Sequence, residues 1–371
     1  MPIEQIWTVM PIPRWPKERR WRVRPSRSEI EELNRADCAV ELLGGWNIEP
    51  LKSIGIGVDW IRQMGAWAKR MRRSGRRPYL LSYNLGPNHF QIGFIVAGSR
   101  IFRVPVCALI TDLDGSLEGG GSFSRRVIYR YQTACLRKVR RLAVLNPEVL
   151  RDISWRGDAP FHLDGLLPDD GFAKKLMELP LKPPGRETRF LYAGSLNALR
   201  GVDRLLEAFL QLGTVDATLT ITGAGPLEQK VAAVAEGSPK VQWRGFLGKE
   251  EERLRTFEAA DIVLNPHRME GEAARSVFPS KLGEALCSGR PVLSTPLRSL
   301  GAMENFLYLS RDDSVEGLRD AMLDLIKMDG RARLAMGEAG RNHARCHYTW
   351  EVQGAKLADW LAEWTSVSST K

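Results

Sequence analysis

The sequence lacks the cysteine patterns of a disulfide framework or a zinc site. No two cysteines form a CxxC pair, and their number is odd. Such a set favours a reducing compartment, with each cysteine a small buried hydrophobic side chain. The five are Cys38, Cys107, Cys135, Cys287 and Cys346. Internal repeats, low-complexity segments, a Ser/His/Asp triad and a Walker loop are also absent from the sequence.

Apolar runs long enough to cross a bilayer are missing as well. None approaches the roughly 18–20 residues that a spanning helix needs. The first residues lack the basic-then-apolar order of a signal peptide, so we expect a cytoplasmic protein. The 371 residues, 43% of them hydrophobic, suffice for more than one packed domain.

Positive charge is distributed unevenly along the chain. Residues 1–185 hold 30 lysines and arginines against 19 aspartates and glutamates, a net charge of +11. The remaining 24 basic and 25 acidic residues give the second half a net charge of −1. This asymmetry indicates an anionic partner for the first half: nucleic acid, a membrane surface or a phosphorylated ligand.

Strand-like and helix-like segments alternate through most of the chain, which predicts parallel α/β architecture. In the first half, strands are expected at 78–84, 104–110 and 141–145, with a further candidate at 6–10. Helices are expected at 59–73, 89–102, 124–141 and 147–153.

Three prolines within residues 179–185 predict an extended linker, after which the alternation starts again. Five strands, each followed by a helix or a turn, then indicate a doubly wound domain. We therefore expect domains at 1–185 and 186–347, followed by a crossover segment at 348–371. The expected strands are 189–193, 218–222, 241–245, 261–265 and 291–295, and the expected helices are 201–212, 226–236, 249–259, 280–288 and 350–364.

Two glycine-bearing turns follow the first two strands of the second half. The first strand ends at Gly194, and a short loop with Arg200 leads into a helix. The second ends at Gly223 and Gly225, and Pro226 takes the first position of the next helix. Helix amides and a guanidinium suit a diphosphate, and glycine lets the backbone approach a ligand closely. Taken singly, each turn is more often an ordinary helix cap.

A third element lies at residues 278–293, with the sequence FPSKLGEALCSGRPVL. Ser280, Lys281 and Glu284 fall on the first turns of one helix, and the last two share a face. A lysine at this end suits a phosphate, and a carboxylate one turn later can accept hydrogen bonds from ribose hydroxyls. A solvated surface pair is the alternative.

In order and spacing, the three elements resemble the C-terminal domain of GT-B glycosyltransferases, particularly glycosyltransferase family 4. The resemblance covers about residues 186–300 and includes the segments WRGF at 243–246 and ADIVLNP at 260–266. The segment YTWE at 348–351 resembles the family's C-terminal crossover. The resemblance implies an α/β chain of two Rossmann-like domains facing a cleft, with a last helix that packs back on the N-terminal domain.

The resemblance also implies roles for individual residues. Arg200 and Lys281 would neutralise the donor diphosphate, and Glu284 would hold the ribose. Asp112 follows the strand at 104–110, where the family often has His-Asp facing the donor sugar, and is the third catalytic candidate. The remaining donor-site candidates are Gly194, Gly223, Gly225, Pro226, Arg244, Phe246, Phe278, Pro279 and Ser280.

The sequence departs from the family pattern at three places. Ser195 stands where many members carry arginine, and Thr111 stands where they often carry histidine. Ser276 occupies the position of a second glutamate, and Glu270 lies 14 residues before Glu284, six more than the family spacing. His267 is the one histidine in the matched region, and we expect a structural role for it.

The predicted function is hexose transfer from a nucleotide sugar to an acceptor hydroxyl, with retention of configuration and without a bound metal or other cofactor, as the resemblance implies. A lipid-linked or saccharide acceptor in polysaccharide assembly is expected. Two basic helices with apolar stripes, at 59–73 and 124–141, indicate peripheral attachment to the anionic inner membrane face. Packing of both stripes on a sheet is the alternative.

Three other functions stay open. The first is a sugar-nucleotide epimerase of the same fold, and the second is a degenerate transferase. The third is a nucleic-acid-binding protein that uses the basic half. No recognised nucleic-acid motif supports the third, so we expect no nucleic-acid partner.

Overall fold

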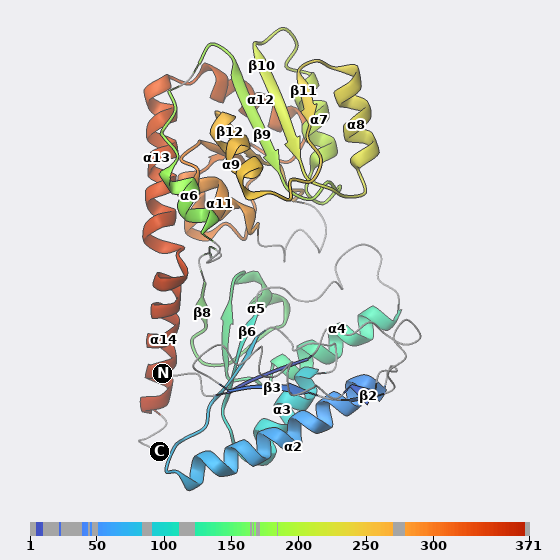
Figure 1. The fold of residues 1–371 in the computed structure, drawn as a ribbon, viewed down its shortest axis with the longest axis vertical. Coiled ribbons are helices and arrows are strands. Elements are labelled where there is room, and N and C mark those ends of the chain that lie inside the picture. Colours follow the sequence, from blue (N-terminus) through green and yellow to red (C-terminus); the bar gives the residue numbers. More distant parts are fainter. Residues whose placement is uncertain are drawn as a thin grey trace. The chain divides into compact units, whose positions relative to one another are not determined.

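The computed structural model divides the chain into two compact units, which are described separately (Figure 1). Unit 1 comprises Met1–His162 with Ala362–Lys371, and unit 2 comprises Leu163–Leu361. The structure describes residues 5–9, 22–23, 39–43, 45–46, 51–83, 91–110, 123–163, 165, 167, 171–183, 185–269 and 279–367. Six residues discussed above lie outside these ranges: Cys38, Thr111, Asp112, Glu270, Ser276 and Phe278.

Unit 1 contains a four-stranded parallel sheet in the order β5-β6-β7-β8. Its strands are Leu80–Tyr83, Val106–Ile110, Arg141–Val144 and Phe161–His162. The helices are α2 (Leu51–Arg73), α3 (Gln91–Phe102), α4 (Phe123–Leu136) and α5 (Glu148–Asp152). Two further pairs are β1 (Gln5–Val9) with β3 (Ala39–Leu43), and β2 (Arg22–Val23) with β4 (Gly45–Trp46). The strands predicted at 6–10, 78–84, 104–110 and 141–145 are confirmed.

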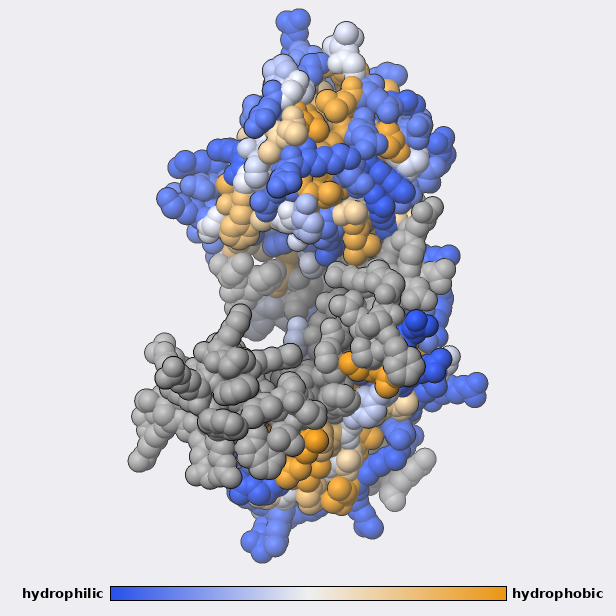
Figure 2. Space-filling view, turned by 90° about the vertical axis from the view of Figure 1, so that its right-hand side faces the viewer, coloured by the Kyte–Doolittle hydropathy of each residue, from blue (hydrophilic) through white to orange (hydrophobic). Residues whose placement is uncertain are grey.

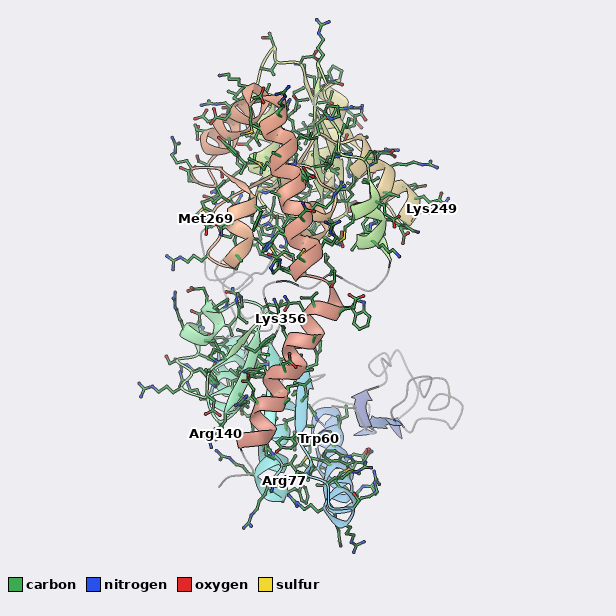
Figure 3. All side chains as sticks on the ribbon, turned by 90° about the vertical axis from the view of Figure 1, so that its left-hand side faces the viewer. Trp60, Arg77, Arg140, Lys249, Met269 and Lys356 are labelled. Atoms are coloured by element: carbon green, nitrogen blue, oxygen red, sulfur yellow. The ribbon has the colours of Figure 1, made fainter. Side chains whose placement is uncertain are left out.

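The apolar stripe of α2 packs inside unit 1. Trp60, Met64 and Trp67 are buried in the core, and a Cβ on Gly98 of α3 would lie 2.7 Å from the Trp60 ring. The arginines of the same helix and Lys69 are exposed, as is Arg77 beyond the helix end (Trp60 and Arg77 are labelled in Figure 3). The α2 stripe is therefore a core face, as the alternative interpretation held.

Unit 2 contains a six-stranded parallel sheet in the order β11-β10-β9-β12-β13-β14. The chain enters the sheet at β9 and adds β10 and β11 on one side. It then adds β12, β13 and β14 on the other side of β9, so the carboxyl ends of β9 and β12 form the topological switch point. The strands are Thr188–Ala193 (β9), Ala217–Thr222 (β10), Val241–Trp243 (β11), Ile262–Asn265 (β12), Val292–Ser294 (β13) and Tyr308–Leu309 (β14).

Helices of unit 2 follow most of the predicted segments. On the face of this unit that Figure 2 shows, hydrophilic residues cover most of the described surface. Its helices are α6 (Phe172–Glu178), α7 (Val202–Leu210), α8 (Glu228–Gly237), α9 (Glu250–Ala259), α11 (Lys281–Cys287), η1 (Gly301–Phe306), α12 (Val315–Lys327), α13 (Gly330–His347) and α14 (Trp350–Val367). The last of these begins in unit 2 and continues past Leu361.

Unit 2 begins before the predicted linker because α6 packs on it. The Phe172 ring meets the Phe257 ring of α9 edge-on, with 6.2 Å between centroids. The linker itself is fastened by Arg290, a buried guanidinium that donates to the Pro180 carbonyl (2.9 Å) and the Glu258 carbonyl (3.3 Å). Burial lowers the pKa of Arg290. These contacts join the linker to the last turn of α9.

Candidate functional site

Two glycine loops interlock at the carboxyl ends of β9 and β10. Gly223 has φ +131°, and a Cβ there would lie 1.8 Å from the Gly194 carbonyl oxygen. Gly225 has φ +155°, and a Cβ there would lie 2.6 Å from the Leu196 carbonyl oxygen. Both positions therefore require glycine because the two loops touch through their backbones.

Several amide groups of these loops are already used within the protein. Gly194 N–H donates to the Thr222 carbonyl (3.1 Å), and Leu196 N–H donates to the Ala224 carbonyl (2.9 Å). Gly225 N–H donates to the Glu228 carboxylate (2.7 Å). The glycines therefore shape the loops, and the amides named here are already used by the protein itself.

The loop after β11 belongs to the same edge of the sheet. Gly223 N–H donates to the Gly245 carbonyl (2.8 Å), and Arg244 N–H donates to the Ile221 carbonyl (3.0 Å). The Phe246 side chain beside them is 76% exposed. An exposed aromatic ring at a loop tip is suited to stacking on a planar ligand.

Arg200 lies against His267, which follows β12. The Arg200 guanidinium contacts His267 Nε2 through Nη1. The backbone N–H of Arg200 donates to Asn197 Oδ1 (2.9 Å). His267 is 6% exposed, and burial, followed by the charge of Arg200, lowers its pKa to about 3. The imidazole is therefore neutral at physiological pH and accepts a hydrogen bond from the guanidinium.

Lys281 and Glu284 lie on α11, as predicted, and pair with each other. Lys281 Nζ is 2.9 Å from Glu284 Oε1, and its side chain is 59% exposed. The Glu284 carboxylate is buried, and its other oxygen is 3.3 Å from Arg253 Nη2. Arg253, on α9, stacks 3.9 Å from the centroid of the Phe172 ring. Sequence reasoning missed Arg253, because no motif in the sequence predicts that α9 brings this arginine to Glu284 on α11.

The predicted site residues thus fall into two groups in unit 2. The contacts above join the first group at the carboxyl ends of β9 to β12. It consists of Gly194, Arg200, Gly223, Gly225 and residues 244–246. Pro279, Ser280, Lys281 and Glu284 are at the start of α11. Asp112 and Phe278 lie outside the described residues.

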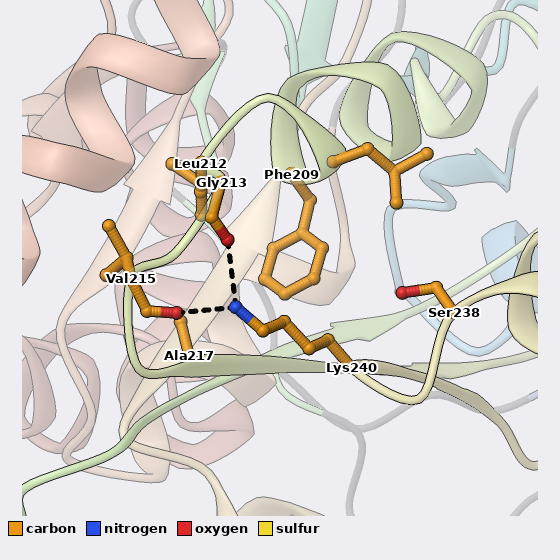
Figure 4. A pocket seen from close by; sticks show the side chains of 8 residues that line it. Phe209, Leu212, Gly213, Val215, Ala217, Ser238 and Lys240 are labelled. Carbon is orange, nitrogen blue, oxygen red and sulfur yellow. Dashed lines mark hydrogen bonds between the residues drawn. The ribbon is translucent and has the colours of Figure 1, made fainter.

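Two cavities occur at the opposite, amino end of the same sheet. One of about 130 Å³ lies between α7 and the starts of β10 and β11, where Lys240 Nζ donates to the Gly213 and Val215 carbonyls (2.9 and 2.8 Å; Figure 4). The other, of about 440 Å³, lies beside the linker and Arg290. Ligands of open parallel sheets bind outside the carboxyl ends of the strands, so we place the candidate site there and not in these cavities.

The described residues contain no cluster of three metal-ligating side chains. Among them, no helix has the length and apolarity needed to cross a membrane. Cys107, Cys135 and Cys287 are buried, as predicted, but Cys346 is exposed on α13.

Residues 187–328 match the family model described as "Glycosyl transferases group 1". A GDP-mannose-dependent monoacylated alpha-(1-6)-phosphatidylinositol monomannoside mannosyltransferase of Corynebacterium glutamicum is 30% identical over 174 residues. A GDP-mannose-dependent alpha-(1-6)-phosphatidylinositol monomannoside mannosyltransferase of Mycolicibacterium smegmatis is 31% identical over 176 residues. Each alignment covers 44% of this chain and 44% of the relative, so the chain matches less than half of their length.

Similarity to solved structures extends over both units. The crystal structure of Anabaena HepE in complex with UDP superposes with a TM-score of 0.63 and 14% sequence identity. The superposition covers 87% of this chain and 86% of HepE. At this identity the likeness establishes the fold, which is the predicted one of two parallel α/β domains.

Proposed function

We propose that the chain transfers a hexose from a nucleotide sugar to an acceptor hydroxyl, because it has the GT-B fold and its residues 187–328 match the group 1 glycosyltransferase model. The observation that carries the proposal is the position of the Arg200 guanidinium, which His267 holds at the switch point. Arg200 lies beside β9 and β12, where open parallel sheets bind their ligands, and its partner is a neutral imidazole.

The chemistry asks the protein to stabilise a departing nucleoside diphosphate. Negative charge grows on the leaving phosphate oxygens as the glycosidic bond to the nucleotide breaks. A guanidinium held in place before the reaction stabilises that charge without reorganising, and exposed Lys281 supplies a second positive charge. Retention of configuration, a reaction without a metal ion, and a role for Asp112 at the sugar belong to the same proposal.

The donor nucleotide divides the relatives. The two mannosyltransferases are GDP-mannose-dependent by name, whereas HepE was crystallised with UDP. We therefore propose a guanosine or uridine diphosphate sugar. Glu284 would accept hydrogen bonds from the ribose once the Lys281 ammonium turns to the phosphates, and Phe246 would stack on the base.

Thermal unfolding of the full chain with UDP-, GDP-, ADP- and dTDP-sugars tests this. A ligand that binds only the folded state raises the melting temperature by mass action. At a concentration 100 times its dissociation constant, it adds about 2.7 kcal/mol to the free energy of unfolding. One nucleotide class should raise it, and the free diphosphate should appear on adding an acceptor. A rise with duplex DNA and none with any sugar nucleotide would favour the nucleic-acid alternative.

The acceptor proposed here is a lipid-linked sugar at an anionic, cytoplasmic membrane surface. Support comes from the +11 charge of residues 1–185 and from the lipid acceptors in the names of both mannosyltransferases. Since the α2 stripe is buried, attraction must act through exposed charges. Each basic residue near such a surface contributes about 1 kcal/mol, and less when salt screens it.

Charge reversal tests the membrane proposal. Lys69, Arg73, Arg126 and Arg130 are exposed, whereas Arg72 contacts the carbonyls of Phe102 and Arg103 at the end of α3 and should be kept. Replacing the first four by glutamate should abolish sedimentation with anionic vesicles while melting temperature and nucleotide binding stay unchanged. The wild-type chain should be released by high salt. Equal binding of both chains, or binding to neutral vesicles, would contradict the electrostatic account.

A further inference from the structure

Of the three arginines around the start of α7 and the end of β12, two have carboxylate partners and one does not. Arg204 pairs with Asp313, and Arg268 pairs with Asp203. Arg200 instead contacts the His267 ring, and among the described residues no carboxylate lies within ion-pair distance of it. Two of these guanidinium groups are thus neutralised by the protein, whereas Arg200 keeps its charge.

The backbone around His267 is held from several sides. Arg268 N–H donates to the Leu199 carbonyl (2.9 Å), and Thr295 Oγ1 donates to the His267 carbonyl (2.7 Å). A Cβ on Gly201, which has φ +69°, would lie 1.7 Å from the Pro266 carbonyl oxygen. The loop that carries Arg200 and the segment that carries His267 therefore touch through their backbones, which places the two side chains next to each other.

The His267 ring carries an unsatisfied polar atom. Nε2 accepts from Arg200, so the single ring proton of the neutral form is on Nδ1. Nδ1 is buried and has no hydrogen-bond partner among the described residues. A buried donor without a partner destabilises the fold. The contact with Arg200 is the polar interaction of this ring among the described residues.

We propose that His267 is a positioning residue that fixes the Arg200 guanidinium for the donor diphosphate without neutralising its charge. The inference rests on the proposed function and adds a residue to it. A carboxylate in this place would hold the guanidinium equally well, but it would compete with the phosphate oxygens. A neutral acceptor restricts one N–H group of Arg200 and leaves the others, with the full positive charge, for the ligand.

Three substitutions separate these effects. His267→Gln keeps a neutral acceptor of similar reach, His267→Phe keeps the ring without an acceptor, and His267→Glu replaces the neutral acceptor by a charged one. The measurements are the affinity for UDP and GDP by calorimetry, and kcat and KM with the preferred sugar nucleotide. Melting temperatures identify variants that do not fold, and His267→Asn, which is neutral but too short to reach Arg200, then takes the place of the phenylalanine variant.

The expected order is wild type, then Gln, then Phe, then Glu. The glutamine variant should stay within about 3-fold of wild type in kcat/KM. The phenylalanine variant should lose about 10-fold, mainly in kcat, because a charge-assisted hydrogen bond is worth at least that factor. The glutamate variant should lose 10-fold or more in diphosphate affinity itself.

A glutamate variant that binds the diphosphate as tightly as wild type, or a phenylalanine variant with unchanged kcat, would overturn the inference. Either result would leave the proposed function intact, since the wild-type chain still binds and turns over the donor. If the wild-type chain binds neither diphosphate and transfers no sugar, the proposed function fails first, and the role of His267 fails with it.

Discussion

Unit 2 and unit 1 use charged residues in different ways. In unit 2 two arginines of the candidate site have a defined side-chain partner: Arg200 contacts His267, and Arg253 contacts Glu284. In unit 1 the basic residues of α2 and α4 are mostly exposed, and their number rather than their geometry is unusual. A single substitution in the first arrangement should therefore have a large effect, whereas the second arrangement should respond only to several changes together.

The largest effect is expected for Arg200→Ala. Removal of one preorganised donor from a site where negative charge develops typically costs about 10²–10³-fold in turnover. We expect kcat to fall by that factor and the donor KM to change less, as steady-state kinetics would show. An increase confined to KM would mean that Arg200 only anchors the donor. As a control, Arg204→Ala removes an arginine that is already paired with Asp313, and should leave kcat within a few-fold.

Gly223→Ala tests whether the loops are as closely packed as the backbone contacts indicate. The new Cβ would lie 1.8 Å from a carbonyl oxygen at a φ of +131°, so both strain and overlap oppose it. We expect the free energy of unfolding to fall by about 2–4 kcal/mol, measured by urea denaturation.

The control is Gly237→Ala at the end of α8, where a Cβ meets nothing within 4 Å. It should be neutral or slightly stabilising. Equal stability of the two variants would show that the loops can separate at little cost.

Glu284→Gln should weaken nucleotide binding. It replaces a charged acceptor by an amide, and a hydrogen bond to a charged group is worth roughly 1.5–3 kcal/mol. Calorimetry with UDP and GDP measures the loss, and unchanged affinity would remove Glu284 from the site. Because the substitution also takes a charge from Arg253, the melting temperature must be followed, and Arg253→Met reports the structural part of the effect.

Acid should destabilise unit 2 through His267, with a smaller effect. Its pKa is about 3 in the folded chain and 6.5 in the unfolded one, so only the unfolded state takes up this proton between those values. The contribution is fully present above pH 6.5 and is lost as the pH falls, by about 1 kcal/mol per pH unit. His267→Gln should flatten the fall of the melting temperature between pH 6.5 and 5. Parallel curves would show that the ring titrates normally.

The sequence was sufficient for β9 to β13 of unit 2 but not for the two-residue strand β14, because a parallel sheet buried on both faces needs continuous apolar runs such as FLYA at 190–193. It missed the first eight residues of α2, where Gly55 and Gly57 interrupt the pattern but a Cβ on Gly57 would lie 2.3 Å from the Phe94 ring of α3. Close helix packing, which depends on a partner far along the chain, explains Gly57.

Individual site residues were predicted, but their partners were not. Arg200 and Glu284 stand in recognisable local motifs, whereas His267 is 67 residues from Arg200 and Arg253 is 31 residues from Glu284. Such pairs are set by which strands end side by side, here β9 and β12. The expected structural role of His267 was incomplete for this reason, since the contact with Arg200 appears only in the fold.

Hydrogen exchange of the full chain with and without UDP or GDP tests most directly whether the donor binds in unit 2. The account predicts slower exchange at residues 194–201, 223–227 and 244–248 and at the start of α11, with no change in α2. It also predicts that Arg200→Ala reduces this protection. Protection confined to unit 1, or none with either nucleotide at saturating concentration, would contradict it.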